Sequence, residues 1–301
     1  MNRPLKTFGI IAGNEITDSA RSRRVIVMVL LYVVGAMAAT ALFIKFLQSV
    51  ETQLVTSLGL AAPRDAGSVT ATLWKSDMFR RMLTGLAGDR ALAEKLLAVP
   101  PLALFYGWLS FAFTPVLVML TASTRIAEEI ATGSVRFVMF RAARSQWCLG
   151  KFAGQAVQIF GALLLSAAGA WVVGYFRMHS FEPAASARYM LLFAVKAWIY
   201  ALPFLGLALA VSQLFSTPNL ALAFGFVSLV GMSVLSRVSA WLAGDGWRRA
   251  WDIVNLLTPG GHRQSLWWGD AAHLLPAIVY LVALALVYLL AGYARFSRRD
   301  L

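Results

Sequence analysis

Uncharged and mostly apolar residues are gathered into six long runs along the chain, separated by segments that hold nearly all the charges. A helix needs about 20 such residues to cross the hydrocarbon core of a bilayer. The runs predict membrane spans at residues 25–46, 102–124, 152–176, 189–215, 220–236 and 274–294. Lipid offers the backbone no hydrogen-bond partner, and the runs lack the alternation of barrel strands. The pattern therefore predicts an all-α fold, a polytopic transmembrane helical bundle of six spans.

The segments outside the spans predict amphipathic helices at the membrane surface. In residues 1–24 one helical face is apolar and the others carry charges, as in interfacial helices. The apolar face consists of Leu5, Phe8, Ala12, Ile16 and Ala20, and the charged positions include Glu15, Arg21, Arg23 and Arg24. Residues 25–301 then form one six-span domain, with outside segments at 48–100 and 237–273 and a compact loop at 125–151. In the first outside segment, Asp89 is placed to cap a short helix that runs through Leu97.

Lysine and arginine near the span ends predict the orientation of the chain. The amino-terminal segment, the loop at 125–151 and the carboxyl-terminal tail hold 13 of these residues in about 60 positions, against 12 in about 100 on the other side. Because cytoplasmic segments carry the excess of positive charge, both termini and this loop are predicted to be cytoplasmic. The first span is interpreted as a retained signal anchor.

Composition and charge exclude several classes of protein. Hydrophobic residues make up 59% of the 301 residues and charged residues 14%, which does not fit a soluble globular enzyme. The net charge of +13 is concentrated beside the spans, where it serves topology and anionic lipid headgroups, so we expect membrane lipids and no nucleic acid as partners. One cysteine and three histidines without paired ligand spacing predict neither a disulfide framework nor a metal site.

Catalytic motifs are absent from the sequence. There is no G-x-x-x-x-G-K-[ST] phosphate loop and no H-E-x-x-H, so the chain is not expected to be an enzyme or to bind ATP itself.

Three residues are candidates for a conduit or gate. Lys196 lies inside the fourth predicted span, where we favour snorkelling to the outer headgroups over a polar conduit. Trp247 and Trp251 lie in a tryptophan-rich outside segment, where interfacial anchoring is favoured over a gate.

The loop at 125–151 combines capping signals with an amphipathic turn. Gly133 can end a helix that extends from the second span, Ser134 can cap a new helix through Ala142, and Ser145 can cap the third span. Glu129 and Arg144 are expected to hold this new helix. It is predicted to lie across the membrane surface, a shape suited to docking on a cytoplasmic partner. The alternative, a solvated connector, fits the spacing equally well.

Several motifs resemble those of the type 2 ATP-binding-cassette (ABC) exporter permeases of bacteria. The loop is similar in Glu129, Gly133 and Ser134, and in Arg144 followed seven residues later by Lys151. The stretch NEITDSARSRR resembles the interfacial helix of that family, and NLLTPGG resembles its outer hairpin. The proline that the family commonly has near Arg141 is absent, and the stretch after Gly133 is about one residue short.

The resemblance implies a permease of the bacterial inner membrane. It would pair with a second permease copy or homologue and with two cytoplasmic ATPase subunits, which would bind ATP and Mg while this chain holds no cofactor. The residues that it assigns to ATPase coupling are Glu129, Gly133, Ser134, Arg136, Arg141, Arg144 and Lys151. Spans without acidic residues and a tryptophan-rich outer segment favour an amphipathic or lipid-like cargo.

Two alternatives from other classes stay open at this point. An intramembrane lipid-modifying enzyme would need polar groups that converge at one depth, and the candidates for this lie on the outer side. A mechanical membrane subunit would use ATPase strokes without a transported substrate.

Overall fold

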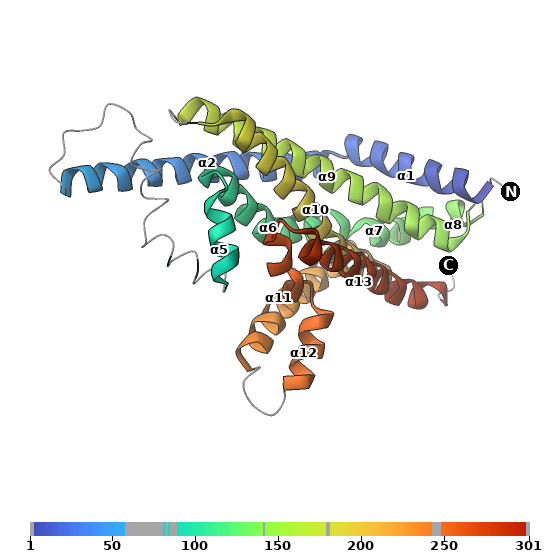
Figure 1. Cartoon of the computed structure of the whole chain (residues 1–301). Helices are drawn as coiled ribbons and strands as arrows, with labels where there is room; N and C mark the ends of the chain where they lie inside the picture. The colour runs from blue at the N-terminus through green and yellow to red at the C-terminus, as the bar shows by residue number, and fades with distance from the viewer. Residues whose placement is uncertain are drawn as a thin grey trace. The chain divides into compact units, whose positions relative to one another are not determined.

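The protein is described from a computed structural model, which describes residues 3–57, 81, 84, 89–140, 142–178, 181–242 and 248–298. These residues are helical almost throughout and contain no strand, so the prediction of an all-α bundle is confirmed (Figure 1). In chain order the helices are α1 (Arg3–Arg21), α2 (Arg23–Ser57), α5 (Arg90–Leu97), α6 (Pro101–Ala122), α7 (Arg125–Ala131), α8 (Ser134–Met139), α9 (Arg144–Arg177), α10 (Pro183–Leu214), α11 (Pro218–Leu242), α12 (Arg248–Leu257) and α13 (Ala271–Ser297), with the 3₁₀ turns η1 (Pro259–His262) and η2 (Gln264–Trp267) before the last.

In the part of the chain that the structure describes, six helical segments are long and apolar enough to cross a membrane. They lie on α2, on α6 together with α7, and on α9, α10, α11 and α13. Each predicted span lies on one of these segments, but α9 begins at Arg144, well before the apolar run. The length of an apolar run indicates only the part of a helix that contacts hydrocarbon. The helix itself can continue beyond that run into the headgroup region and the solvent. Ser145 is therefore inside α9 and is not its cap.

A short helix in the first outside segment follows its predicted capping signal. Asp89 has an extended backbone, and its carboxylate accepts a hydrogen bond of 2.7 Å from the backbone N–H of Ala91. The helix α5 begins at the next residue and ends at Leu97, as predicted. An N-cap of this kind satisfies one of the free donors of the first turn.

The chain divides into two compact units. The first comprises Met1–Val29, Phe111–Gly161 and Trp198–Leu301, and the second comprises Leu30–Ser110 and Ala162–Ala197. In the second unit, Phe43 stacks on Phe105 with 4.2 Å between ring centroids. The hydroxyl of Tyr106 donates a 2.9 Å hydrogen bond to the carbonyl of Leu163.

In the first unit, α10 and α13 approach each other through small residues. A Cβ added at Gly206 would overlap the carbonyl of Ala285, and one added at Gly292 would overlap the backbone of Ala210. Lipid provides no hydrophobic force between helices, so close backbone packing of small residues takes its place. This contact holds the last span against the fourth.

Tyrosine side chains of α13 form hydrogen bonds with α12, which packs against α11. Tyr280 donates a 2.6 Å hydrogen bond to the carbonyl of Leu256, and Tyr288 donates one of 2.5 Å to that of Leu257. Both carbonyls belong to the last turn of α12, where a helix has no internal donors left for them. Two tyrosine side chains of α13 thus supply hydrogen-bond donors to the free carbonyl groups at the carboxyl end of α12.

We expect the double variant Gly206→Val/Gly292→Val to lose about 3 kcal/mol of stability, because the new side chains meet backbone atoms that cannot rotate away. Gly231→Val on α11 is the control, since a Cβ there has nothing within 4 Å. Thermal unfolding in detergent measures both. Equal melting temperatures for the double variant and the control would contradict the close packing of α10 and α13.

Candidate functional site

The site begins at a break between α6 and α7. The hydroxyl of Ser212, on α10, accepts hydrogen bonds from the backbone N–H groups of Ile126 (3.0 Å) and Ala127 (2.9 Å). These donors lie in the first turn of α7, where the helix offers them no acceptor. A residue of the fourth span therefore fixes where α7 begins.

A turn at Gly133 separates α7 from α8. Gly133 has φ +72° and is the one described residue in the left-handed region, so the prediction that it ends the preceding helix is confirmed. The role predicted for Ser134 is wrong, since Ser134 is the first residue of α8 and its hydroxyl points back to the carbonyl of Glu129, at 3.3 Å. The helix is also shorter than predicted and ends at Met139.

A buried ion cluster joins α1, α7 and α9. Lys151 of α9 lies between two carboxylates, forming an ion pair of 2.5 Å with Glu15 of α1 and another with Glu129 of α7. The second oxygen of Glu15 accepts a 2.6 Å hydrogen bond from the amide of Gln155. Glu15 is only 4% exposed. Breaking a buried pair of this kind leaves an uncompensated charge, which costs about 3–5 kcal/mol.

Two more polar residues complete this cluster. Arg125, at the start of α7, donates a 2.9 Å hydrogen bond to the hydroxyl of Ser19, and its Nε lies 3.8 Å from Glu15. Ser19 also accepts a 3.3 Å hydrogen bond from Gln155. The polar face of α1 thus carries two buried groups, each bonded to other helices.

The helix α1 lies close against α9 because α9 presents two glycines there. A Cβ at Gly150 would come within 2.6 Å of Ile11, and one at Gly154 within 2.7 Å of the Cβ of Glu15. The spacing Gly-x-x-x-Gly lets two helix backbones approach closely. The charge of Glu15 can reach Lys151 because this approach is possible.

The orientation of α1 differs from the simplest reading of its amphipathic pattern. Glu15 and Ser19 face the protein, whereas Ile10 and Ile16 are exposed. The polar face turns inward because Lys151, Gln155 and Arg125 satisfy it there. The exposed apolar face is then available to lipid, so the interfacial assignment of α1 stays a prediction.

The electrostatics of the cluster favour an ionised Glu15. Burial alone would raise the pKa of Glu15, but the charge of Lys151, hydrogen bonds from Lys151 and Gln155, and the charge of Arg125 together hold the pKa below its usual value. The carboxylate is therefore charged at neutral pH. Its charge is what keeps α1 attached to α9.

Arg144 contacts a different element from the one expected. Its guanidinium donates hydrogen bonds to the carbonyls of Phe296 (3.2 Å) and Ser297 (2.7 Å) in the last turn of α13. A cation at the carboxyl end of a helix is stabilised by the free carbonyls and the helix dipole. Arg144 therefore anchors the end of the last span, and its predicted role in holding α8 stays a prediction.

The other predicted residues have several environments. Arg136 is exposed on α8, Arg24 pairs with Glu128 at 2.8 Å, and Arg21 and Arg23 are exposed. Arg141 and Trp247 lie outside the described residues, as does the side chain of Trp251 on α12.

Lys196 is only 3% exposed, with its nitrogen 5.7 Å from the ring centroid of Phe193. The side chain of Lys196 is thus enclosed by protein, and its snorkelling to the outer headgroups stays a prediction.

Several members of the site were missed by sequence reasoning. Ser19, Arg125, Gln155 and Ser212 carried no motif of their own. The spacing of Lys151 and Gln155, four residues apart like Gly150 and Gly154, was the available signal, since such pairs share a helix face. No group of three histidine, cysteine, aspartate or glutamate residues able to hold a metal ion occurs in the described part of the chain.

Within the described residues, six apolar helices are able to span a membrane, and a buried ion cluster joins α7 to α1 and α9, which is the framework of a polytopic membrane protein. The family model described as ABC-2 family transporter protein matches residues 10–301. The chain therefore belongs to the ABC-2 transporter family, as a permease of an ABC transporter. This membership implies a partnership with ATP-binding-cassette ATPase subunits. A search of curated proteins returns no match.

We expect Glu15→Gln to lower the stability of the protein by about 3 kcal/mol, because Lys151 loses one of its two balancing charges in a buried position. Asp18→Asn is the control on the same helix, since Asp18 is exposed. Thermal unfolding in detergent compares the two. If both variants melt together, the ion cluster does not hold α1.

The same carboxylate predicts a dependence of stability on pH. A carboxyl whose pKa is lowered on folding adds stability above its unfolded pKa, and this is lost as the pH falls through the folded value. Melting temperatures should therefore fall as the pH drops below 4.5, the ordinary value for Glu15. Glu15→Gln should flatten this acid limb, and Asp18→Asn should leave it unchanged.

Proposed function

We propose that this chain is the permease subunit of an ABC exporter of the bacterial inner membrane. It couples ATP hydrolysis by two separate ATPase subunits, which bind ATP and Mg, to the movement of an amphipathic or lipid-like substrate. A second permease copy or a homologous permease completes the transporter, and both chain termini are cytoplasmic. Family membership supports the permease role and the ATPase partnership.

The observation that carries this proposal is the exposed face of α8. Phe137 is 77% exposed and Phe140, directly after α8, is 86% exposed, while Arg136 adds a positive charge beside them. Val135 is buried and holds the other face of α8 against the protein. Aromatic and arginine side chains are enriched at the centres of protein interfaces. We infer that this face docks on the ATPase.

The contacts around α7 support transmission of movement from α8 to the spans. Ser134 bonds back to the carbonyl of Glu129, and the carboxylate of Glu129 pairs with Lys151 of the third span. Ser212 connects α7 to the fourth span. Because these contacts are polar and those of Ser212 are buried, α7 moves with its neighbours or must break them. A push on α8 thus reaches three spans, since α7 also continues into α6.

The common location of several chain segments supports the proposed topology. The amino-terminal part of α1, the helix α8 and the carboxyl end of α13 lie at one end of the first unit (Figure 1). The bonds from Arg144 to the end of α13 and the contact of Ile11 with Gly150 agree with this placement. One side of the membrane then holds both ends of the chain and the docking helix.

We expect Phe137→Ser/Phe140→Ser to weaken co-purification with the cognate ATPase subunit by at least about tenfold, because two exposed aromatic anchors are removed. The matched control is Tyr175→Ser/Phe176→Ser. These two exposed aromatic residues lie near the carboxyl end of α9, whereas α8 precedes the amino end of α9. ATPase stimulation in proteoliposomes gives the functional readout. Wild-type binding and stimulation in the α8 variant would overturn the docking role.

A further inference from the structure

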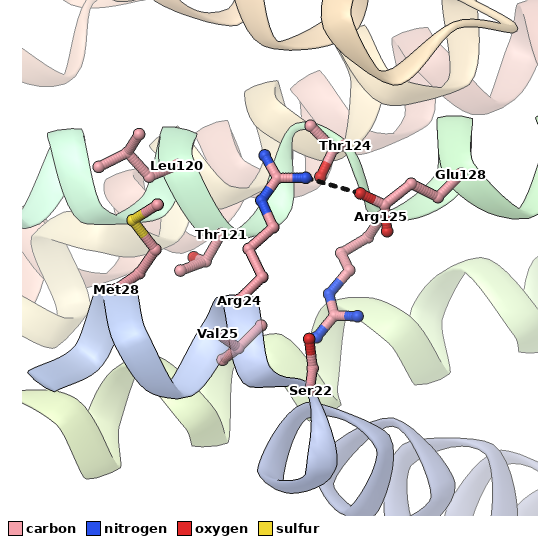
Figure 2. A pocket seen from close by; sticks show the side chains of 9 residues that line it. All are labelled: Ser22, Arg24, Val25, Met28, Leu120, Thr121, Thr124, Arg125 and Glu128. Atoms are coloured by element: carbon pink, nitrogen blue, oxygen red, sulfur yellow. Dashed lines mark hydrogen bonds and ion pairs between the residues drawn. The ribbon is translucent and has the colours of Figure 1, made fainter.

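A pocket opens beside the ion cluster, where α2 begins and α6 passes into α7. Figure 2 shows its lining, in which Arg24 extends toward Thr124 and Glu128 while Arg125 extends toward Ser22. The empty space amounts to about 240 Å³ when its open mouth is included. Because this volume includes open solvent, the enclosed space is smaller still than the roughly 300–1,000 Å³ of typical small-molecule sites. The pocket therefore suits one small polar group of a larger ligand that stays outside.

The charges of the pocket select the sign of that group. Arg24 and Arg125 each contribute a guanidinium group to the lining and Glu128 contributes one carboxylate, so the lining residues carry a net positive charge. The hydroxyl of Thr124 lies in the same lining and makes no capping bond to α7. Guanidinium groups bind phosphate oxygens in a planar, two-pronged geometry. A phosphate group fits this chemistry.

The position of the pocket and the apolar residues in its lining indicate which kind of molecule carries the phosphate. Val25, Met28 and Leu120 give the lining an apolar side. The pocket also lies at the start of the candidate span that begins at Arg23 and in the last part of the one that runs from Pro101 to Ala131, and the ends of spans are where lipid headgroups are met. We propose that this pocket binds the phosphate of an anionic phospholipid, with the acyl chains along the apolar side.

The existing contacts leave the arginines able to bind this group. Arg24 is 42% exposed and its pair with Glu128 is open to solvent, so a phosphate can compete for it. Arg125 bonds to Ser19 and its Nε lies 3.8 Å from the carboxylate of Glu15, and this buried Nε donates no hydrogen bond among the described residues. The lipid is a bound component of the protein, so the site does not depend on which substrate is transported.

Photoreactive phosphatidylglycerol tests the site on the full chain in phosphatidylcholine nanodiscs. Cross-links should map to residues 22–28 and 120–128. Arg24→Gln should lower their yield about fivefold, less than for a fully buried charge-assisted bond because Arg24 is partly exposed. The control Arg23→Gln removes the same charge one residue away, from an exposed position outside the pocket lining, and should leave the yield unchanged.

A second variant separates binding from misfolding. Glu128→Gln removes the competing carboxylate and should raise the yield. A fall in both the Arg24 and Glu128 variants, or equal labelling by photoreactive phosphatidylcholine, would overturn the proposal. Loss of the cross-link in excess inorganic phosphate would also overturn it, because the pocket would then be a site for free phosphate.

Discussion

The structure depends on the balance of charge around one buried lysine. Lys151 has lost its water, and such a loss is tolerated only when opposite charges and hydrogen bonds replace it. Glu15 and Glu129 supply the charges, each from a different helix. The first helix, the loop and the third span are therefore held in one arrangement by a single ammonium group.

The rest of the bundle is held by different forces. Between helices in lipid, apolar contact alone gives little net attraction, so packing of small residues and polar bonds must act instead. Gly206 and Gly292 bring α10 and α13 together, and Gly150 and Gly154 bring α1 to α9. Polar bonds to Ser212, Lys151 and Arg125 hold α7, which adjoins the helix proposed to receive force.

Local features of this fold could be predicted, because each depends on a few neighbouring residues. The six spans follow from the length of apolar runs, and the turns at Gly133 and Asp89 follow from the backbone preferences of single residues. The inward orientation of Glu15 could not be predicted, since its partner lies 136 residues away. The capping of α7 by Ser212 and the bonds of Arg144 to α13 likewise join distant parts of the chain.

The separation of Glu15 from Lys151 also sets an order of assembly. At the about 5–20 residues per second of protein synthesis, the ribosome adds the 136 residues between them in on the order of ten seconds. During that time the first span is already being inserted, while the helix before it has no lysine to bind. The amino-terminal helix can therefore dock in its final position only after the third span has been synthesised.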